Sequence, residues 1–271
     1  MTQKYILTNY GYYKNIKTKK LPYDKGYIQK RNNTDVVFYK KRKDILRRDF
    51  QKKLLPIVIK AKEIFCEDLR ILDIGCGDGV VLESLFDIGR TQKIKIKLYG
   101  IDPDNFAFKD IRVSAKLTKG VSEKMPYDDS FFHVVISSQM IEHLTEIQTD
   151  KTNKETLRIL KMSGFYYIET PNPQSSLAKT KKSRWQMFLP DHLVLYPPNA
   201  LAVLLKNVGF RDIKAGARYE KDEQINEIQD TFISRFPFAK NQHIARIGMF
   251  LFKIYIMVSN NGAITCVLAR K

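Results

Sequence analysis

Short apolar runs alternate along the chain with stretches in which apolar residues recur every three or four positions. Short runs bounded by polar residues predict strands, and the longer spacing predicts helices. We expect strands at 71–74, 97–102, 114–120, 131–137, 165–169, 210–219 and 263–270. We expect helices at 39–65, from 80 onward, at 153–161 and at 199–207, with Pro56 starting a second helix inside the first range. This alternation is typical of an α/β protein with a parallel sheet and helices on both faces.

The first predicted strand runs directly into a glycine-rich turn, Asp73-Ile74-Gly75-Cys76-Gly77-Asp78-Gly79, and a helix follows. A strand, a glycine-rich turn and a helix in this order form the nucleotide-binding element of open α/β sheets. The spacing G-x-G-x-G differs from the dinucleotide pattern, and the Lys-Ser/Thr end of a P-loop is missing. The Asp73 carboxylate would repel a pyrophosphate but suits a cationic amino-acid group.

This turn resembles motif I of the class I S-adenosylmethionine (SAM) methyltransferases, D-[IVL]-G-C-G-x-G. The resemblance implies a Rossmann-like fold with a seven-stranded, mostly parallel sheet whose last strand is antiparallel. It also implies SAM as the cofactor, with contacts at the following residues of the turn: Asp73, Gly75, Cys76, Gly77 and Gly79. A glycine turn that binds nothing is the alternative.

Two further segments are expected to hold the cofactor. Asp102 ends the second strand, 23 residues after Gly79, where an acid accepts hydrogen bonds from ribose hydroxyls; a turn-capping aspartate is the alternative. Residues 121–132 resemble the family segment D-A-E-x-L-P-F-x-D-x-S-F, but Val121 replaces its first acid. The resemblance therefore assigns the adenine contact to Ser122 or Glu123. His133 replaces an aspartate of the family pattern, and we expect it to be structural.

The segment Ser138-Gln139-Met140-Ile141-Glu142-His143-Leu144 resembles the family's [V/A]-x-E-H-[LV] element. The resemblance places Gln139 and its apolar neighbours along the methionine end of the cofactor and His143 near the sulfonium. A Thr-Pro-Asn at 170–172, then Asp191-His192, then a helix ending in Gly209-Phe210 are similar to small-molecule methyltransferases of the ubiquinone-biosynthesis type. That resemblance covers about residues 68–215.

Methyl transfer to a hydroxyl needs a base, and imidazole titrates in the right range. The candidates are His143 and His192, with Asp191 as an orienting residue, and we favour His192 for acceptor contact. The expected acceptor is an oxygen of a small molecule, a sugar or a lipid-linked compound.

Basic residues are distributed unevenly along the chain. The net charge is +18, and residues 1–70 hold 19 Lys and Arg against 7 Asp and Glu. We divide the chain into a basic, helical N-terminal cover (1–65), a SAM-binding core (66–219), an apolar helical insertion (220–261) and a final core strand (262–271). Because a basic arm also suits polyanions, a nucleic-acid or protein methyltransferase remains an alternative. So does a SAM-binding protein that has lost catalysis.

Other features narrow the function. Residues 137–140 read Ser-Ser-Gln-Met, where a nucleic-acid amino-methyltransferase carries [ND]-P-P-[YF], so nucleic acid is the less favoured acceptor. The apolar stretch 244–258 is too short and too charged to span a bilayer, but it could lie at an anionic membrane surface, cover the sheet or form a dimer contact. Three scattered cysteines and a polar N-terminus suit a cytoplasmic protein without a signal peptide. No metal site is expected, because no His and carboxylate cluster has ligand spacing along the sequence.

Overall fold

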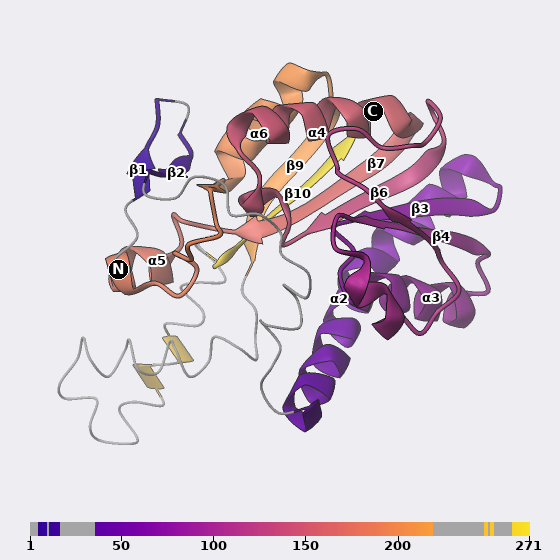
Figure 1. Ribbon diagram of the computed structural model, residues 1–271, viewed down its shortest axis with the longest axis horizontal. Coiled ribbons are helices and arrows are strands. Elements are labelled where there is room, and N and C mark those ends of the chain that lie inside the picture. The colour runs from indigo at the N-terminus through magenta and orange to yellow at the C-terminus, as the bar shows by residue number, and fades with distance from the viewer. Residues whose placement is uncertain (1–4, 10, 17–35, 219–246, 249, 252–261) are drawn as a thin grey trace.

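A computed structural model describes residues 5–9, 11–16, 36–218, 247–248, 250–251 and 262–271 of the chain (Figure 1). The described residues form a seven-stranded sheet of order β5-β4-β3-β6-β7-β10-β9. Its strands are β3 (Leu69–Ile74), β4 (Ile96–Asp102), β5 (Lys116–Lys119), β6 (Phe132–Ser138), β7 (Leu160–Pro171), β9 (Arg211–Arg218) and β10 (Ile264–Arg270). Neighbouring strands from β5 to β7 pair in parallel, whereas β10 pairs antiparallel with both β7 and β9. The predicted fold class is therefore confirmed.

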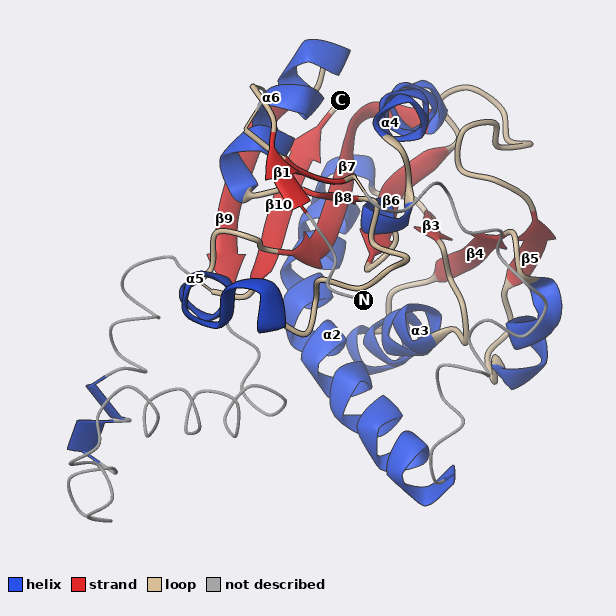
Figure 2. Ribbon diagram, turned by 60° about the vertical axis from the view of Figure 1, so that its left-hand side comes forward, coloured by secondary structure: helices blue, strands red, loops and turns tan. Residues whose placement is uncertain are grey.

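Helices cover both faces of this sheet. Helices α2 (Val36–Phe65) and α3 (Val80–Gln92) lie on one face, and α4 (Glu146–Ile159) and α6 (Pro198–Val208) lie on the other (Figure 2). Side chains of β3 belong to two hydrophobic cores, one on each face of the sheet. Leu69 and Ile71 pack on the α2 side, and Leu72 and Ile74 pack on the α4 side. Burial on both faces explains why β3 is almost continuously apolar.

Helix α2 differs from its prediction. It runs from Val36 to Phe65 without a break, and Pro56 lies inside it instead of starting a second helix. Buried residues on either side of Pro56, such as Leu54 and Val58, hold the helix against the sheet. This packing outweighs the hydrogen bond that the proline nitrogen cannot donate. Helix α4 also begins earlier than predicted, at Glu146, because Thr145 and Gln148 form a capping box.

The N-terminal cover also differs from its prediction. Its described part begins with two short strands, β1 (Tyr5–Leu7) and β2 (Tyr13–Asn15), and only α2 is helical. These strands form a small antiparallel sheet with β8 (Val194–Leu195), which comes from a distant part of the chain. We call β1, β2 and the turn between them the N-terminal hairpin. It buries part of the tyrosine-rich sequence, including Tyr12.

The segment between β7 and α6, residues 172–197, is here called the roof segment. It contains α5 (Ser176–Lys181), a 3-10 turn η3 (Lys182–Arg184) and β8. Its own small core includes Leu177, Trp185 and Leu195, and Tyr5 and Tyr13 of the N-terminal hairpin pack against that core. The roof segment and the hairpin therefore lie together near the carboxyl end of β7.

The predicted insertion at 220–261 falls almost entirely outside the described residues. Of its apolar stretch, only 247–248 and 250–251 are described, and both pairs are helical. None of the helices in the described part of the chain is long and apolar enough to cross a bilayer.

Candidate active site

The glycine-rich turn links the carboxyl end of β3 to the start of α3. Gly75, Gly77 and Gly79 have φ angles of 72°, 45° and 78°, a region that other residues rarely adopt. Space is also short at two of them: a Cβ on Gly75 would lie 2.5 Å from Met140 Cγ, and one on Gly79 would lie 2.6 Å from Ile111 Cγ1. The sequence needs glycine at these positions for both backbone conformation and close packing.

Asp102 fixes this turn to the neighbouring strand. One carboxylate oxygen of Asp102 accepts a hydrogen bond from the Gly77 backbone N–H at 3.0 Å. The other oxygen accepts from the Asp104 backbone N–H at 2.8 Å. The side chain is buried, and burial raises its pKa although both hydrogen bonds act in the opposite direction. Asp102 therefore places a carboxylate beside the glycine-rich turn at the end of β4.

Asp73 is a second buried acid at the same edge of the sheet. Burial, and then the charge of nearby Asp102, raise the pKa of the Asp73 carboxyl well above its usual range. No cation is among the groups that shift this pKa in the described part of the chain. A ligand carrying an ammonium group would therefore relieve an electrostatic strain that the described residues leave in place.

The remaining predicted cofactor residues occupy different environments. The Cys76 side chain is buried, and its Sγ atom would lie 2.8 Å from a Cβ on Gly100, so it packs between β3 and β4. Gln139 is exposed, with a φ of 52°, and its backbone N–H donates to the Glu169 carbonyl. Ser122 hydrogen-bonds Thr152, and Glu123 accepts a hydrogen bond from Gln148, so both tie their loop to α4. Their assignment to adenine stays a prediction.

The two candidate histidines meet beneath the roof segment. His143 lies in a 3-10 turn, η2 (Ile141–His143), that follows β6, and His192 lies in the roof segment. Their rings contact edge to face, with centroids 4.9 Å apart. Together with Glu142 they form a buried group whose nitrogen and oxygen ligand atoms all lie within 4.8 Å of one another.

Hydrogen bonds orient each member of this group. His143 Nδ1 lies 3.0 Å from the Asp191 carbonyl oxygen and 3.5 Å from an Asp191 carboxylate oxygen. His192 Nδ1 lies 2.8 Å from the Met187 carbonyl oxygen. Because a carbonyl oxygen only accepts, Nδ1 of each imidazole carries a proton, and Nε2 has the lone pair when the ring is neutral. A backbone carbonyl thus orients each ring, and the Asp191 carboxylate also lies close to His143.

Sequence reasoning missed two residues of this site. Glu142 is almost completely buried, and the hydroxyl of Thr170, at the end of β7, donates to its carboxylate at 2.9 Å. The Glu-His pair after the fourth predicted strand was the available signal for Glu142. Sequence spacing suggested no cluster of histidines and carboxylates, but the fold assembles one from residues that lie far apart in the chain.

The N-terminal hairpin holds the roof segment over this cluster. The Tyr5 hydroxyl lies 2.7 Å from the His192 carbonyl oxygen and 3.0 Å from that of Leu189. The Tyr5 ring stacks on Phe188, with centroids 4.5 Å apart. On the other side, the Leu193 backbone N–H donates to the Glu142 carbonyl at 2.7 Å. The backbone around His192 is therefore fixed from two directions.

His133 lies away from this cluster and fits the predicted structural role. It is completely buried at the start of β6, and its Nδ1 accepts a hydrogen bond from the Arg70 backbone N–H at 2.8 Å. Its Nε2 lies 2.8 Å from the Glu67 carboxylate. Burial lowers the pKa of His133, which favours the neutral imidazole that this bridge requires.

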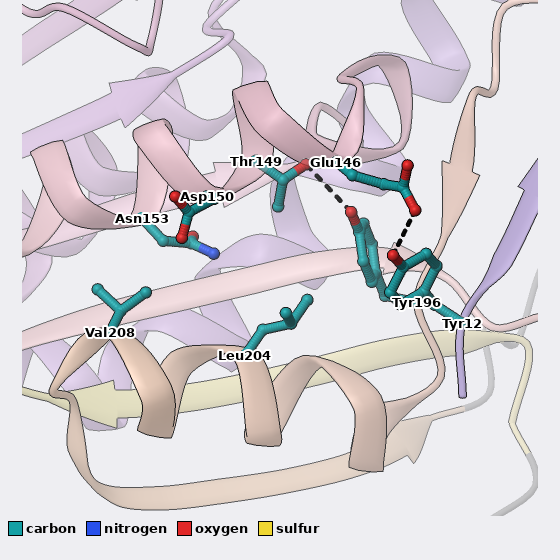
Figure 3. Close-up of a pocket in the computed structure, with 8 residues that line it drawn as sticks. All are labelled: Tyr12, Glu146, Thr149, Asp150, Asn153, Tyr196, Leu204 and Val208. Carbon is teal, nitrogen blue, oxygen red and sulfur yellow. Dashed lines mark hydrogen bonds between the residues drawn. The ribbon is translucent and has the colours of Figure 1, made fainter. Parts of the chain in front are cut away.

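A separate pocket of about 40 Å³ lies between α4 and α6 (Figure 3). Tyr12 and Tyr196 line one end of it, and their hydroxyls bond to Glu146 and Thr149, respectively. Ligand pockets usually measure several hundred Å³, so this one is far too small for a nucleoside. The pocket is thus distinct from the nucleotide-binding edge of the sheet.

The sheet order, the antiparallel β10 and the glycine-rich turn at the carboxyl end of β3 together define a Rossmann-like fold of the class I SAM-dependent methyltransferases. The family model described as "Methyltransferase domain" matches residues 41–215, well over half of the chain. The chain therefore belongs to this methyltransferase domain family.

Curated relatives are similar over parts of their length. The ubiquinone biosynthesis O-methyltransferase of Pelagibacter ubique is 28% identical over 120 residues, which cover 42% of this chain and 47% of that protein. The demethylmenaquinone methyltransferase of Chlorobaculum tepidum is 26% identical over 163 residues, which cover 52% and 65%. The sterol 4-C-methyltransferase strm-1 of Caenorhabditis elegans is 29% identical over 119 residues, which cover 43% and 35%. The chain spans between about a third and two thirds of the length of these relatives.

Solved structures share the fold at low sequence identity. A SAM-dependent methyltransferase from Archaeoglobus fulgidus superposes with a TM-score of 0.55 at 20% identity, covering 83% of this chain and 94% of that one. A putative methyltransferase from Haloferax volcanii, solved with the Trm112 activator, has the same TM-score at 15% identity and covers 83% and 92%. These likenesses concern the fold.

The residues at the carboxyl ends of β3 and β4 fit SAM. The cofactor carries an ammonium group, and Asp73 is a buried acid whose pKa is raised by burial and by the charge of Asp102. SAM also carries ribose hydroxyls, and the Asp102 carboxylate is fixed beside the turn with lone pairs to accept from them. SAM is therefore the cofactor that both the family and the local chemistry indicate.

Proposed function

We propose that this protein transfers the methyl group of SAM to an oxygen of a small-molecule, sugar or lipid-linked acceptor. The observation that carries the proposal is the buried group of Glu142, His143 and His192 beneath the roof segment. It lies after β6 and against the end of β7, at the edge of the sheet where ligands of open α/β folds bind. The O-methyltransferase among the relatives supports an oxygen acceptor, and the C-methyltransferase is the reason to test it.

The cofactor would be held by the two buried acids and the glycine-rich turn. In this proposal Asp73 pairs with the ammonium group, Asp102 accepts from the ribose hydroxyls, and the turn leaves room for the cofactor against the backbone of Gly75, Gly77 and Gly79. Ser122 or Glu123 contacts the adenine, and Gln139 lies beside the methionine portion. Cys76 contributes through its backbone, because its side chain is packed in the core.

SAM supplies an activated methyl group on its sulfonium. The protein's task is to hold the acceptor oxygen in line with that methyl group and to remove the hydroxyl proton as the new carbon–oxygen bond forms and the carbon–sulfur bond breaks. We assign proton removal to His192, whose Nε2 can accept because Nδ1 donates to the Met187 carbonyl. Asp191 keeps His143 in the matching tautomer.

The first test is incubation of SAM carrying a labelled methyl group with an extract of the source cells, followed by separation of the products. Label in the lipid or small-molecule fraction, in a product that resists acid hydrolysis as an ether does, is the expected result. Label in nucleic acid or protein would replace the proposal with the alternative that uses the basic arm. SAM binding without any labelled product would contradict methyl transfer to an acceptor in that extract.

The second test is His192→Ala. Because a general base contributes about 10²–10⁴ in rate, we expect turnover to fall within that range while the Kd for SAM stays unchanged. Gln186→Ala, an exposed residue of the same segment, is the matched control and should retain full activity. Unchanged turnover in His192→Ala, or loss of SAM binding, would contradict the assignment.

A further inference from the structure

We propose that Glu142, His143 and His192 bind one divalent transition-metal ion, of which Zn²⁺ is the prototype. The three residues offer two imidazole nitrogens and one carboxylate oxygen, all within 4.8 Å of one another. All three side chains are buried, with exposed fractions of 1%, 7% and 1%. Nothing in the family assignment of the chain requires this cluster.

The hydrogen bonds around the cluster are those that metal ligands need. A histidine ligand usually donates its other ring N–H to a carbonyl or carboxylate, which fixes the tautomer and aims the lone pair at the metal. Here His192 donates Nδ1–H to the Met187 carbonyl, and His143 donates Nδ1–H to the Asp191 carbonyl with the Asp191 carboxylate nearby. Because Nδ1 is engaged with a carbonyl in each ring, Nε2 is the nitrogen that would bind the ion.

The carboxylate is supported in the same way. One oxygen of Glu142 accepts from the Thr170 hydroxyl at 2.9 Å, which orients the side chain. Burying a carboxylate is costly unless an opposite charge or several hydrogen bonds compensate for it. A divalent cation between Glu142 and the two imidazoles would add an opposite charge to the bond that the carboxylate accepts from Thr170.

The ligand set indicates which ion fits. Two histidines and one glutamate are a known ligand set of catalytic zinc, and two histidines with one carboxylate also bind Fe²⁺. Mg²⁺ and Ca²⁺ prefer oxygen ligands and should bind poorly. Zinc–nitrogen bonds of about 2.1 Å place tetrahedral ligand atoms roughly 3.4 Å apart, so the three side chains must draw together slightly. Three protein ligands leave a coordination position for an oxygen from solvent or from the acceptor.

This inference deepens the proposed function and rests on it for the role of the ion, although metal binding itself does not. A bound ion lowers the pKa of an oxygen coordinated to it. An acceptor hydroxyl on the open position would then give its proton to solvent water instead of to His192. Its oxygen would form the new carbon–oxygen bond as the carbon–sulfur bond of SAM breaks.

The test measures metal binding without SAM or acceptor. Full-length protein, purified without a histidine tag and carrying Cys66→Ser to remove an exposed thiol, is stripped with a chelator and titrated with Co²⁺ and Zn²⁺. We expect one ion per chain, a visible Co²⁺ absorption spectrum of low symmetry, and displacement of Co²⁺ by Zn²⁺ but not by Mg²⁺. Affinity should fall at acid pH as the imidazoles become protonated. Absence of stoichiometric binding at neutral pH would overturn the proposal.

Variants locate the ion. Glu142→Gln and His192→Ala should abolish the Co²⁺ spectrum, and Thr170→Val should weaken binding by about 10–100-fold, as expected for an outer-shell partner. Glu67→Gln is the matched control, because it removes a carboxylate beside a different buried histidine, His133. Thermal unfolding with and without Zn²⁺ tests binding even when a variant is less stable. Zn²⁺ should raise the Tm of the control and should not raise the Tm of Glu142→Gln. Binding that is equal in all variants would overturn the assignment, whether or not methyl transfer is found.

Discussion

Replacing Gly75 by alanine tests how tightly the glycine-rich turn is packed. The substitution costs free energy in two ways. A residue with a Cβ pays roughly 1–2 kcal/mol for a left-handed φ such as the 72° observed at Gly75. The new Cβ would also lie 2.5 Å from Met140 Cγ and 2.9 Å from Met140 Cβ, where carbon atoms prefer about 3.5–4.0 Å.

The clash forces buried Met140 to move by about 1 Å, and such overpacking typically costs about 1–3 kcal/mol. The lower entropy of the unfolded chain returns roughly 0.4–1 kcal/mol. We therefore expect Gly75→Ala to lower the free energy of unfolding by about 2–4 kcal/mol. SAM affinity should fall as well, because the turn cannot keep its position beneath Met140.

Urea denaturation separates the two costs. Gly11→Ala is the matched control: its φ is 80°, but a Cβ there would meet only Ala200 Cβ at 3.9 Å, so it reports the backbone cost alone. In the double variant Gly75→Ala/Met140→Ala, the 2.5 Å contact with Met140 Cγ is removed and the 2.9 Å contact with Cβ remains. The clash is therefore relieved in part, and the double variant should be about 0.5–3 kcal/mol more stable than the sum of the single effects implies. Additive effects, or equal losses for Gly75→Ala and Gly11→Ala, would refute the clash.

Three further predictions concern the acids and the roof. Asp102→Asn should weaken SAM binding at least tenfold, as measured by calorimetry. The substitution removes the charge from the hydrogen bonds that hold the Gly77 and Asp104 backbone N–H groups. An unchanged affinity for SAM would contradict this role. Asp73 should release a proton when SAM binds, because an ammonium partner lowers a pKa that burial has raised, so SAM affinity should rise with pH through that pKa. Calorimetry in buffers of different ionisation enthalpy measures this release of a proton. Asp73→Asn should abolish it, and a proton released by the variant as well would have to come from another residue. Tyr5→Phe should lower the free energy of unfolding by about 1 kcal/mol, because the lost hydroxyl holds the His192 carbonyl. It should also reduce kcat without changing the Kd for SAM. An unaltered kcat would show that the roof segment does not depend on this bond.

The glycine-rich turn and the acid beside it, which form the proposed cofactor half of the site, could be predicted from the sequence because their signals are local. The turn from Gly75 to Gly79 needs positive φ angles within a few residues of a buried strand, and glycines at alternate positions indicate that need. Asp102 was predictable for a similar reason, since it ends the next parallel strand and the carboxyl ends of parallel strands meet at one edge. The sequence did not indicate the hydrogen bond by which Asp102 holds the Gly77 N–H.

The acceptor half depends on tertiary packing, and sequence patterns indicated it only in part. The tyrosines of the first 16 residues show no strand or helix period, since β1 and β2 are only three residues long. Strand β1 pairs with β2, and β2 pairs with the distant β8. The length of α2 was misread at Pro56 because burial against the sheet, invisible in a local pattern, overrides the proline preference. The cluster at Glu142 escaped notice because its third member, His192, reaches it through the roof.

Glu142 connects these two halves of the site. Its side chain accepts from Thr170 at the end of β7, its backbone carbonyl accepts from Leu193 in the roof segment, and it follows β6 in the chain. The position of His192 is therefore set by the sheet through Glu142 on one side and by the N-terminal hairpin through Tyr5 on the other. Because the hairpin pairs with residues of β8 about 180 positions later in the chain, we expect the proposed acceptor site to be completed late in folding. The cofactor site needs only neighbouring parallel strands, so the two sites should respond differently to destabilisation, with acceptor binding lost before SAM binding.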